Sequence, residues 1–164
     1  RDIHTVYVFN HSDRDLTDYL ERLKKAIDKE DVKVVQCKAV EELVRNSDII
    51  CTTTPSTTPV LPDDKELLRG KCIIAIGSYM PDAVLDLVDN VYIELPYACE
   101  ESGDLSQPLA SGKLTKDRVK LMHEYLVSGE KEIKEGQTTY FKSVGMGLFD
   151  VCIAQKLYEV AKEK

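Results

Sequence analysis

The chain has 164 residues, of which 43% are hydrophobic and 31% are charged, and its formal net charge is −7. This length and composition are typical of one globular domain and exclude a disordered or fibrous class. Its uncharged apolar runs, such as Cys72 to Ile76, are far shorter than the roughly 20 residues of a membrane-spanning helix. The acidic balance disfavours binding to a phosphate backbone. We therefore expect neither a membrane nor a nucleic-acid partner.

The cysteines are widely separated and include no CxxC pair, which predicts reduced thiols in a cytoplasmic protein. They are Cys37, Cys51, Cys72, Cys99 and Cys152. The polar residues Arg1 to His4 do not resemble a signal peptide, so we expect no secretory leader.

Strands and short helices are predicted to alternate along the first two thirds of the chain. β-Branched and aromatic residues predict a buried strand at 5–9, and apolar residues three or four apart predict a helix at 16–27. The same criteria predict a strand at 32–35, a brief helix at 40–46, a strand at 49–54, a proline-rich loop at 55–62, a short helix ending at Gly70, and strands at 72–76 and 91–94.

The last third has a different pattern. Apolar residues between 114 and 126 predict one helix, 129–136 is a charged connector, 138–141 is strand-like, and 148–161 is predicted to be a long helix. The strands are nearly continuous apolar runs, which is typical of sheets covered on both faces. Strands that alternate with helices predict the α/β class with a parallel sheet.

Small polar residues follow three of the predicted strands. They are Asn10-His11-Ser12, Thr52 to Thr57 and Gly77-Ser78-Tyr79. In parallel α/β sheets, ligands bind at the carboxyl ends of strands, so these clusters predict a site for a polar ligand. Each cluster taken alone is also explained by turns and helix caps.

Five segments follow one another in order: VYVFNHS at 6–12, SDIICTTTP at 47–55, IAIGSYMPD at 74–82, ESGD at 101–104 and TYFKSVG at 139–145. Together they resemble motifs of the ornithine cyclodeaminase/mu-crystallin family, and the likeness extends over essentially the whole chain. The resemblance implies a Rossmann-like domain that binds NAD or NADP. It also implies hydride exchange with a small amino acid, its imine or a cyclic ketimine.

The glycine-rich G-x-G-x-x-G loop of a Rossmann domain is absent from this sequence. The resemblance therefore implies a Rossmann-like parallel sheet that lacks its first strand-turn-helix, followed by C-terminal helices. Residues 1–136 are expected to form the truncated NAD(P)-binding domain. Residues 137–164 are expected to return toward an absent N-terminal domain that holds substrate and forms a homodimer. We expect the chain to be the C-terminal part of a longer protein and to be inactive alone.

The resemblance also assigns cofactor contacts to particular residues. Asn10, His11 and Ser12 match positions at the adenosine ribose, and Thr53, Thr54 and Pro55 match the loop over the adenine and ribose. Ile76, Gly77 and Ser78 match the stretch beside the nicotinamide. Val144 and Gly145 match residues whose backbone groups can bond the carboxamide. The first strand ends at Asn10 without a carboxylate, which favours NADP over NAD. His11 replaces the family's arginine, and Arg14 is a candidate substitute.

Tyr79 occupies the position at which cyclodeaminases carry a catalytic aspartate. A phenol is a poor base at neutral pH, so this residue favours reduction or oxidation at a C–N centre over deamination. Tyr79 is thus the candidate catalytic residue, as a hydrogen-bond donor to substrate, with packing as the alternative. A cyclodeaminase-type lyase and a non-catalytic nucleotide-binding protein remain the other hypotheses. His4, His11 and His123 do not have the spacing of metal ligands, and we expect no metal site.

Overall fold

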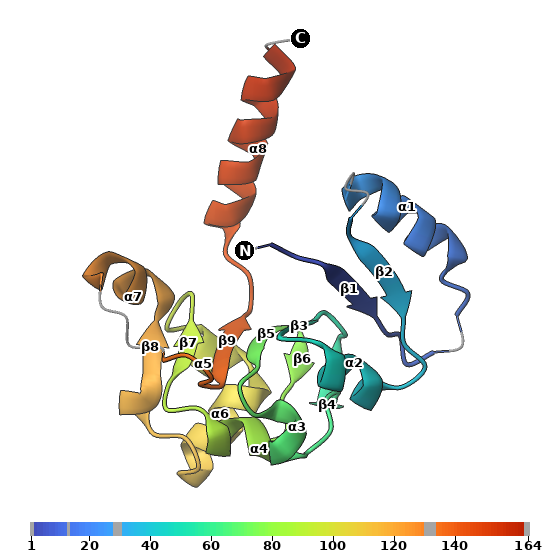
Figure 1. Ribbon diagram of the computed structural model, residues 1–164. Helices are drawn as coiled ribbons and strands as arrows, with labels where there is room; N and C mark the ends of the chain where they lie inside the picture. Colours follow the sequence, from blue (N-terminus) through green and yellow to red (C-terminus); the bar gives the residue numbers. More distant parts are fainter. Residues whose placement is uncertain (1, 13, 28–30, 130–133, 163–164) are drawn as a thin grey trace. The chain divides into compact units, whose positions relative to one another are not determined.

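The computed structural model describes residues 2–12, 14–27, 31–129 and 134–162 (Figure 1). The chain folds into two compact units, residues 1–48 and residues 49–164. Both units contain parallel strands and helices, which confirms the predicted α/β class.

The first unit is a two-stranded parallel sheet with two helices. Its elements are β1 (Thr5–Val8), α1 (Thr17–Ile27), β2 (Lys33–Gln36) and α2 (Val40–Asn46). The register of the two strands runs from Thr5 opposite Lys33 to Val8 opposite Gln36. Asp15 caps the start of α1, because its Oδ1 accepts from the Thr17 backbone N–H at 2.9 Å. The four predicted elements of this region are confirmed, with small shifts at their ends.

The second unit contains a five-stranded parallel sheet in the order β3-β5-β9-β7-β8. These strands are β3 (Ile49–Thr52), β5 (Cys72–Ile76), β9 (Thr139–Ser143), β7 (Val91–Ile93) and β8 (Val119–Leu121). The last strand in the sequence, β9, lies in the centre of this sheet. Because all five strands are parallel, their carboxyl ends lie along one edge.

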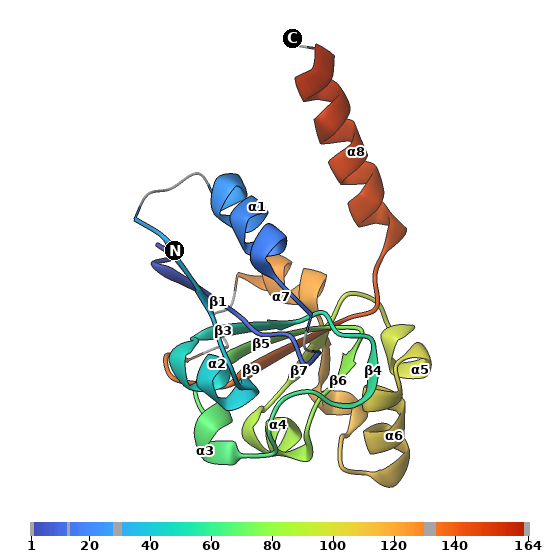
Figure 2. The same cartoon turned by 90° about the vertical axis from the view of Figure 1, so that its right-hand side faces the viewer.

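Helices α3, α4 and α6 lie beneath one face of the five-stranded sheet in both views (Figures 1 and 2). The helices of this unit are α3 (Lys65–Leu68), α4 (Asp82–Leu87), α5 (Ala98–Glu101), α6 (Gly103–Ser111), a 3-10 turn at Lys116–Arg118, α7 (Met122–Ser128) and α8 (Gly147–Lys162). The core is a row of buried side chains across four strands, made of Ile50, Ile73, Tyr140 and Val91.

Within the second unit, α3, α4 and α6 all cover the same face of this sheet, whereas helices on both faces were expected. Burial alternates along β3, and Ile49 at its start is 44% exposed. The reason is that α3, α4 and α6 are all on the same side of the sheet. Apolar character was therefore a better guide to strand position than to the number of covered faces.

Two further predictions were wrong. The loop predicted at 55–62 contains a strand, β4 (Ser56–Pro59), which pairs in parallel with β6 (Ser78–Tyr79). The single helix predicted between 114 and 126 is instead a 3-10 turn, strand β8 and helix α7. The apolar spacing there matched a helix by coincidence, because Val119 and Leu121 alternate along an edge strand that pairs with β7. Much of the predicted charged connector, at 130–133, lies outside the described residues.

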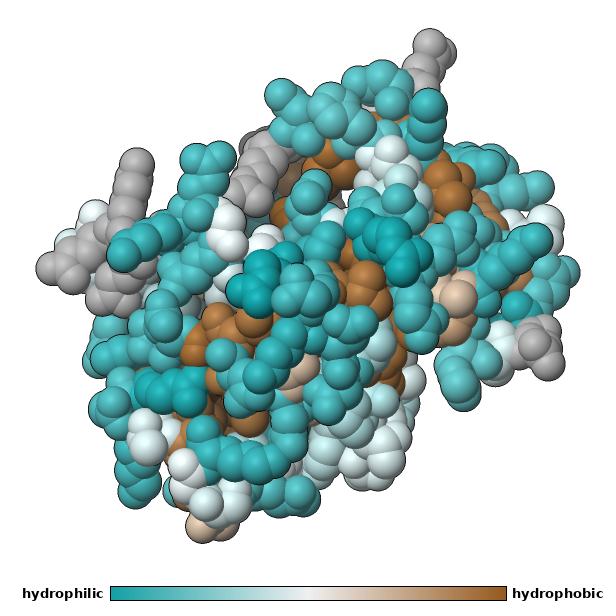
Figure 3. Space-filling view, turned by 60° about the horizontal axis from the view of Figure 1, so that its bottom comes forward, coloured by the Kyte–Doolittle hydropathy of each residue, from teal (hydrophilic) through white to brown (hydrophobic). Residues whose placement is uncertain are grey.

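Hydrophilic residues cover most of the face shown in Figure 3, with hydrophobic residues between them. Among the helices of the described ranges, none is both long and apolar enough to cross a membrane. Helix α8 has no buried residue. Its large apolar side chains are exposed, namely Leu148, Phe149, Val151, Ile153, Leu157, Tyr158 and Val160.

Candidate functional site

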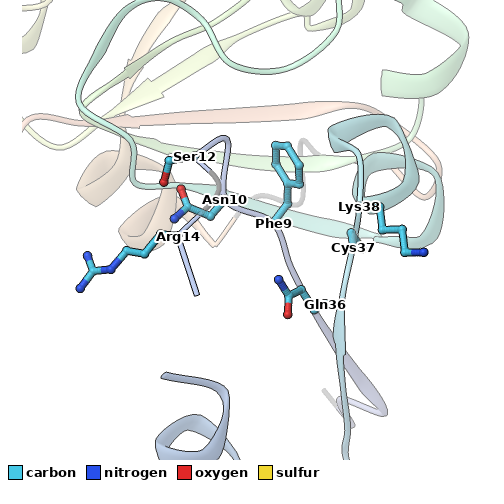
Figure 4. A pocket seen from close by; sticks show the side chains of 7 residues that line it. All are labelled: Phe9, Asn10, Ser12, Arg14, Gln36, Cys37 and Lys38. Atoms are coloured by element: carbon cyan, nitrogen blue, oxygen red, sulfur yellow. The ribbon is translucent and has the colours of Figure 1, made fainter. Parts of the chain in front are cut away.

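A pocket of about 500 Å³ opens at the carboxyl ends of β1 and β2 in the first unit (Figure 4). It is lined by Phe9, Asn10, Ser12, Arg14, Gln36, Cys37 and Lys38. Two predicted contacts of the adenosine ribose, Asn10 and Ser12, therefore line a pocket, whereas His11 is not among its lining residues. Gln36 to Lys38 were missed, although they follow the neighbouring parallel strand and could have been found by treating both strand ends alike.

The charges around this pocket favour an anionic or neutral polar ligand. Its described lining residues include two cations, Arg14 and Lys38, and no carboxylate. In the view of Figure 4, the Lys38 side chain leads away from the others, while Arg14 lies on the same side as Asn10. Burial raises the pKa of the Cys37 thiol, and the charge of Glu42 adds to this effect, so the thiol stays neutral.

In the second unit, two of the predicted clusters meet at the edge formed by the carboxyl ends of β3 and β5. The buried Ser78 hydroxyl donates to the Thr54 carbonyl at 2.6 Å, and the Ser56 backbone N–H donates to the Gly77 carbonyl at 3.3 Å. Gly77 has φ of +76°, a conformation that favours glycine. Thr53, Thr54, Pro55 and Ile76 are exposed at this edge, where a ligand can reach them.

A buried ionic cluster fixes the position of one turn at this edge. Lys142 Nζ lies 3.3 Å from Asp104 Oδ1 and donates to the Ser78 carbonyl at 3.0 Å. The other oxygen of Asp104 accepts from the Tyr140 hydroxyl at 2.7 Å, and the Ser102 hydroxyl also donates to Asp104. The Lys142 and Asp104 side chains are only 3% and 2% exposed. The ESGD segment and β9 thereby fix the turn that contains Ser78.

Desolvation is the main reason that the pKa of Tyr140 lies well above its ordinary value, and the neighbouring Asp104 carboxylate raises it further. The sequence analysis did not single out this cluster as a site. The available signal was a lysine directly after the strand-like run at 138–141, since a charge that is buried in a sheet requires a partner.

Tyr79 packs against the start of α6. A Cβ atom added to Gly103 would overlap the Tyr79 hydroxyl oxygen, so only glycine leaves room for this ring. Tyr79 is half-buried and pairs through β6 with β4. This contact is the one expected of a packed aromatic residue, and the role of Tyr79 toward substrate stays a prediction.

Val144 and Gly145 follow β9, and their backbone N–H groups face a carboxylate. Both donate to Glu94 Oε1, at 2.6 and 2.8 Å, and the Ser143 hydroxyl donates to the same oxygen at 2.9 Å. Glu94 follows β7 directly and is 5% exposed. It was missed because one acidic residue after an apolar run is also typical of a solvated strand end.

The predicted residues are thus divided between the units. Asn10, His11 and Ser12 belong to the first unit, and those numbered 53–55, 76–79 and 144–145 belong to the second. Across the described ranges, no group of three His, Cys, Asp or Glu side chains is placed to hold a metal ion.

Comparison with known proteins places the chain in a family. It is 30% identical to Delta(1)-pyrroline-2-carboxylate reductase of Bacillus cereus (strain ATCC 10987 / NRS 248), in a match that covers 100% of this chain and 52% of the reductase. It is 34% identical to mouse ketimine reductase mu-crystallin, with 79% of this chain and 40% of that protein covered. The chain therefore spans about half the length of the reductase that it matches.

Among solved structures, the fold resembles Thermococcus litoralis Delta(1)-pyrroline-2-carboxylate reductase in complex with NADH and L-proline. The TM-score is 0.78 at 21% identity, with 99% of this chain and 52% of that chain covered. The pattern of the ornithine cyclodeaminase/mu-crystallin family matches residues 1–164, which is every residue of the sequence. The chain therefore belongs to the ornithine cyclodeaminase/mu-crystallin family.

Proposed function

We propose that the protein containing this chain is an NAD(P)-dependent oxidoreductase that reduces a small cyclic imino acid. The observation that carries this proposal is the 30% identity to a pyrroline-2-carboxylate reductase over the whole chain. The likeness to mouse ketimine reductase mu-crystallin supports the same class of C=N substrate. The Thermococcus litoralis reductase in complex with NADH supports a nicotinamide cofactor.

The residues present fit such a cofactor. The pocket of the first unit offers amide, hydroxyl and guanidinium groups, which suit a ribose and its phosphates. In the second unit, two buried oxygens at the carboxyl edge have no partner within the described residues, namely Thr52 Oγ1 and Glu94 Oε2. Buried polar atoms normally have partners, so these two leave acceptor capacity for a ligand.

When bound, the reduced nicotinamide would supply a hydride to the imine carbon. The chain's own residues bind the cofactor and orient it. The Thr53–Pro55 loop and the Gly77 turn would hold the cofactor at the carboxyl ends of β3 and β5, and the buried Lys142–Asp104 pair fixes the Ser78 carbonyl beneath it. Tyr79 is the residue that we propose faces substrate from this edge.

The proposal is tested by mixing the natural polypeptide that contains this sequence with NADPH or NADH and Δ1-pyrroline-2-carboxylate. We expect the absorbance of the reduced nicotinamide to fall and proline to form in equal amount. Ammonia release from ornithine without net cofactor consumption would instead establish a cyclodeaminase. Cofactor binding without turnover of either substrate would favour a non-catalytic nucleotide-binding protein.

We also propose a preference for NADP over NAD, with Arg14 as the cation nearest to Asn10 and Ser12 along the described chain. Replacing Arg14 by alanine should weaken NADPH binding by roughly tenfold and NADH binding much less, since only NADPH carries the 2′-phosphate. Arg22→Ala removes the same charge from α1 and is the matched control. Equal loss for both cofactors would contradict the preference.

We further propose that the protein is cytoplasmic and acts as a homodimer, with residues 137–164 leading toward a substrate and dimerisation domain. All five cysteines are free, which suits a reducing compartment. The exposed apolar side chains of α8 suit burial against another domain. Light scattering of the natural polypeptide should give twice its monomer mass, and the monomer mass would contradict the dimer.

A further inference from the structure

The turn after β9 is held by one buried carboxylate from a distant part of the chain. Glu94 Oε1 accepts three hydrogen bonds, from the Ser143 hydroxyl and the Val144 and Gly145 backbone N–H groups. The donors are 49 to 51 residues away in sequence, so this contact joins the carboxyl ends of β7 and β9. Gly145 has φ of +90°, a backbone conformation that favours glycine.

These donors stabilise the buried carboxylate of Glu94. It is 5% exposed, and within the described residues it forms no ion pair. A buried carboxylate without a cation must be stabilised by hydrogen bonds. The three donors therefore fix the carboxylate, and the carboxylate in turn fixes the orientation of the Val144 and Gly145 N–H groups.

The orientation of these N–H groups also sets the orientation of two carbonyls. The peptide bonds of the described residues are trans, and in a trans peptide the C=O points opposite to the N–H of the next residue. Because the Val144 and Gly145 N–H groups point to Glu94, the carbonyls of Ser143 and Val144 point away from it. Ser143 pairs with Ile76 in the parallel β5–β9 ladder, in which its carbonyl faces the Gly77 N–H. The turn therefore presents the Val144 carbonyl, an acceptor, on the side opposite to Glu94.

We propose that Glu94 is a positioning residue for the nicotinamide end of the cofactor, because it holds the Val144 carbonyl as an acceptor for the carboxamide amino group. This inference rests on the proposed function, in which residues 144 and 145 lie beside the nicotinamide. It also narrows the earlier prediction for these residues. Their backbone N–H groups already have an acceptor, so the contact with the carboxamide is made through a carbonyl oxygen, that of Val144.

The test compares three ligands on the wild-type protein and four variants of the natural polypeptide. NADH carries the carboxamide amino group, and its acetylpyridine analogue carries a methyl group in the same place. We expect the wild-type protein to bind NADH more tightly than the analogue by roughly tenfold, the effect of one hydrogen bond to a ligand. The affinity for ADP-ribose, which lacks the nicotinamide ring, reports on binding at the rest of the site.

Glu94→Ala should abolish the preference for NADH over the analogue and leave the affinity for ADP-ribose within about twofold. Glu94→Gln should retain the preference, because its carbonyl oxygen can accept from the same three donors. Glu94→Asp has a shorter side chain and should show an intermediate preference for NADH over the analogue. It replaces Glu94→Ala as the test if the alanine variant does not fold. Glu100→Gln removes one exposed charge from α5 and should behave as the wild-type protein.

The outcomes separate this inference from the proposed function. Failure of the wild-type protein to bind NADH or NADPH would overturn the proposed function together with the role of Glu94. Wild-type binding without a preference for NADH over the analogue, or an equal preference in Glu94→Ala, would overturn the role of Glu94 alone. A proportional loss of affinity for all three ligands in Glu94→Ala would show that Glu94 only stabilises the fold.

Discussion

At the scale of single residues, the candidate site depends on buried charged side chains that fix one of its turns. Lys142 and Asp104 are almost completely buried, and each uses its partner to offset the cost of losing water. Asp104 also accepts from Tyr140 and Ser102, so its hydrogen bonds extend to β9 and to the residue before α6. The Ser78 carbonyl is held by Lys142 from within this cluster.

Replacing Lys142 by methionine should lower the free energy of unfolding by about 3–5 kcal/mol, because it leaves the Asp104 carboxylate buried without a cation. The double variant Lys142→Met/Asp104→Asn should recover part of this loss. Lys113→Met, which breaks the exposed pair with Asp82, should change stability little. Urea unfolding measures all three, and equal effects of the two single variants would contradict the burial argument.

Stability should also fall at high pH because of Tyr140. Its pKa in the folded protein is raised well above its ordinary value, first by desolvation and then by Asp104. The folded state therefore favours the neutral phenol. This contribution is complete below pH of about 10, where the unfolded tyrosine is also neutral, and is lost as the pH rises from there toward the folded pKa.

Urea unfolding between neutral pH and pH of about 11 should show a steeper loss of stability in the wild-type protein than in Tyr140→Phe. The exposed Tyr97→Phe is the control and should follow the wild-type slope. If Tyr140→Phe and the wild-type protein lost stability in parallel, Tyr140 would not be the group responsible.

Residue-level prediction from the sequence succeeded where local chemistry decides the position. Ser78 and Thr54 follow apolar runs and do meet at one edge of the sheet. Lys142, Asp104 and Glu94 were not predicted, because the partners that join them to other strands are 36 to 64 residues away in sequence. Such long-range contacts follow from strand order, which apolar periodicity does not reveal.

At the scale of elements, one arginine joins a helix to an edge strand. Arg118 Nη2 donates to the Leu85 and Val88 carbonyls at 2.7 and 2.6 Å, and its Nε donates to the Asp89 carbonyl at 3.1 Å. These carbonyls lie at or just beyond the end of α4, where helical partners are lacking. The planar guanidinium thus anchors the end of α4 beside the start of β8.

Arg118→Lys should therefore destabilise the second unit by about 1–3 kcal/mol, because one ammonium group cannot reach three carbonyls with the same geometry. Amide exchange in β7 and at the end of α4 should increase. Arg69→Lys, at an exposed arginine that pairs with Glu66, is the matched control and should leave exchange there unchanged. Unaltered exchange in Arg118→Lys would show that water satisfies these carbonyls equally well.

The elements themselves were largely predictable, and the exceptions have a common cause. β5 was predicted at its observed bounds because five consecutive apolar residues end at a glycine. β8 was mistaken for part of a helix because three residues are too few to show their own periodicity. Helices α4 to α6 were not predicted. The first two, with six and four residues, are too short to show a helical period, and α6 contains glycine, serine and proline, which have weak helix propensity.

At the scale of the whole molecule, the two units differ in how much sheet each contains. The first has two hydrogen-bonded strands and the second has a five-stranded sheet with a buried row of side chains. A two-stranded sheet is marginally stable in water without further packing. Within the described residues, β1 pairs only with β2, and β3 pairs only with β5.

Residues 49–164 expressed alone should keep their structure, with slow amide exchange in β5 and β9. Residues 1–48 alone should exchange rapidly, because their helices and two strands bury little apolar surface. Circular dichroism and amide exchange of both fragments check this. Loss of protection in the larger fragment would show that its sheet requires the first 48 residues.

The position of β9 has a consequence for synthesis on the ribosome. β5 and β7 are both made well before β9, yet each forms hydrogen bonds with β9 and not with the other. Until residues 139–143 emerge, the nascent chain can complete only the outer pairs, β3 with β5 and β7 with β8. The open edges of β5 and β7 therefore persist until β9 emerges, and unpaired strand edges of this kind are prone to aggregation.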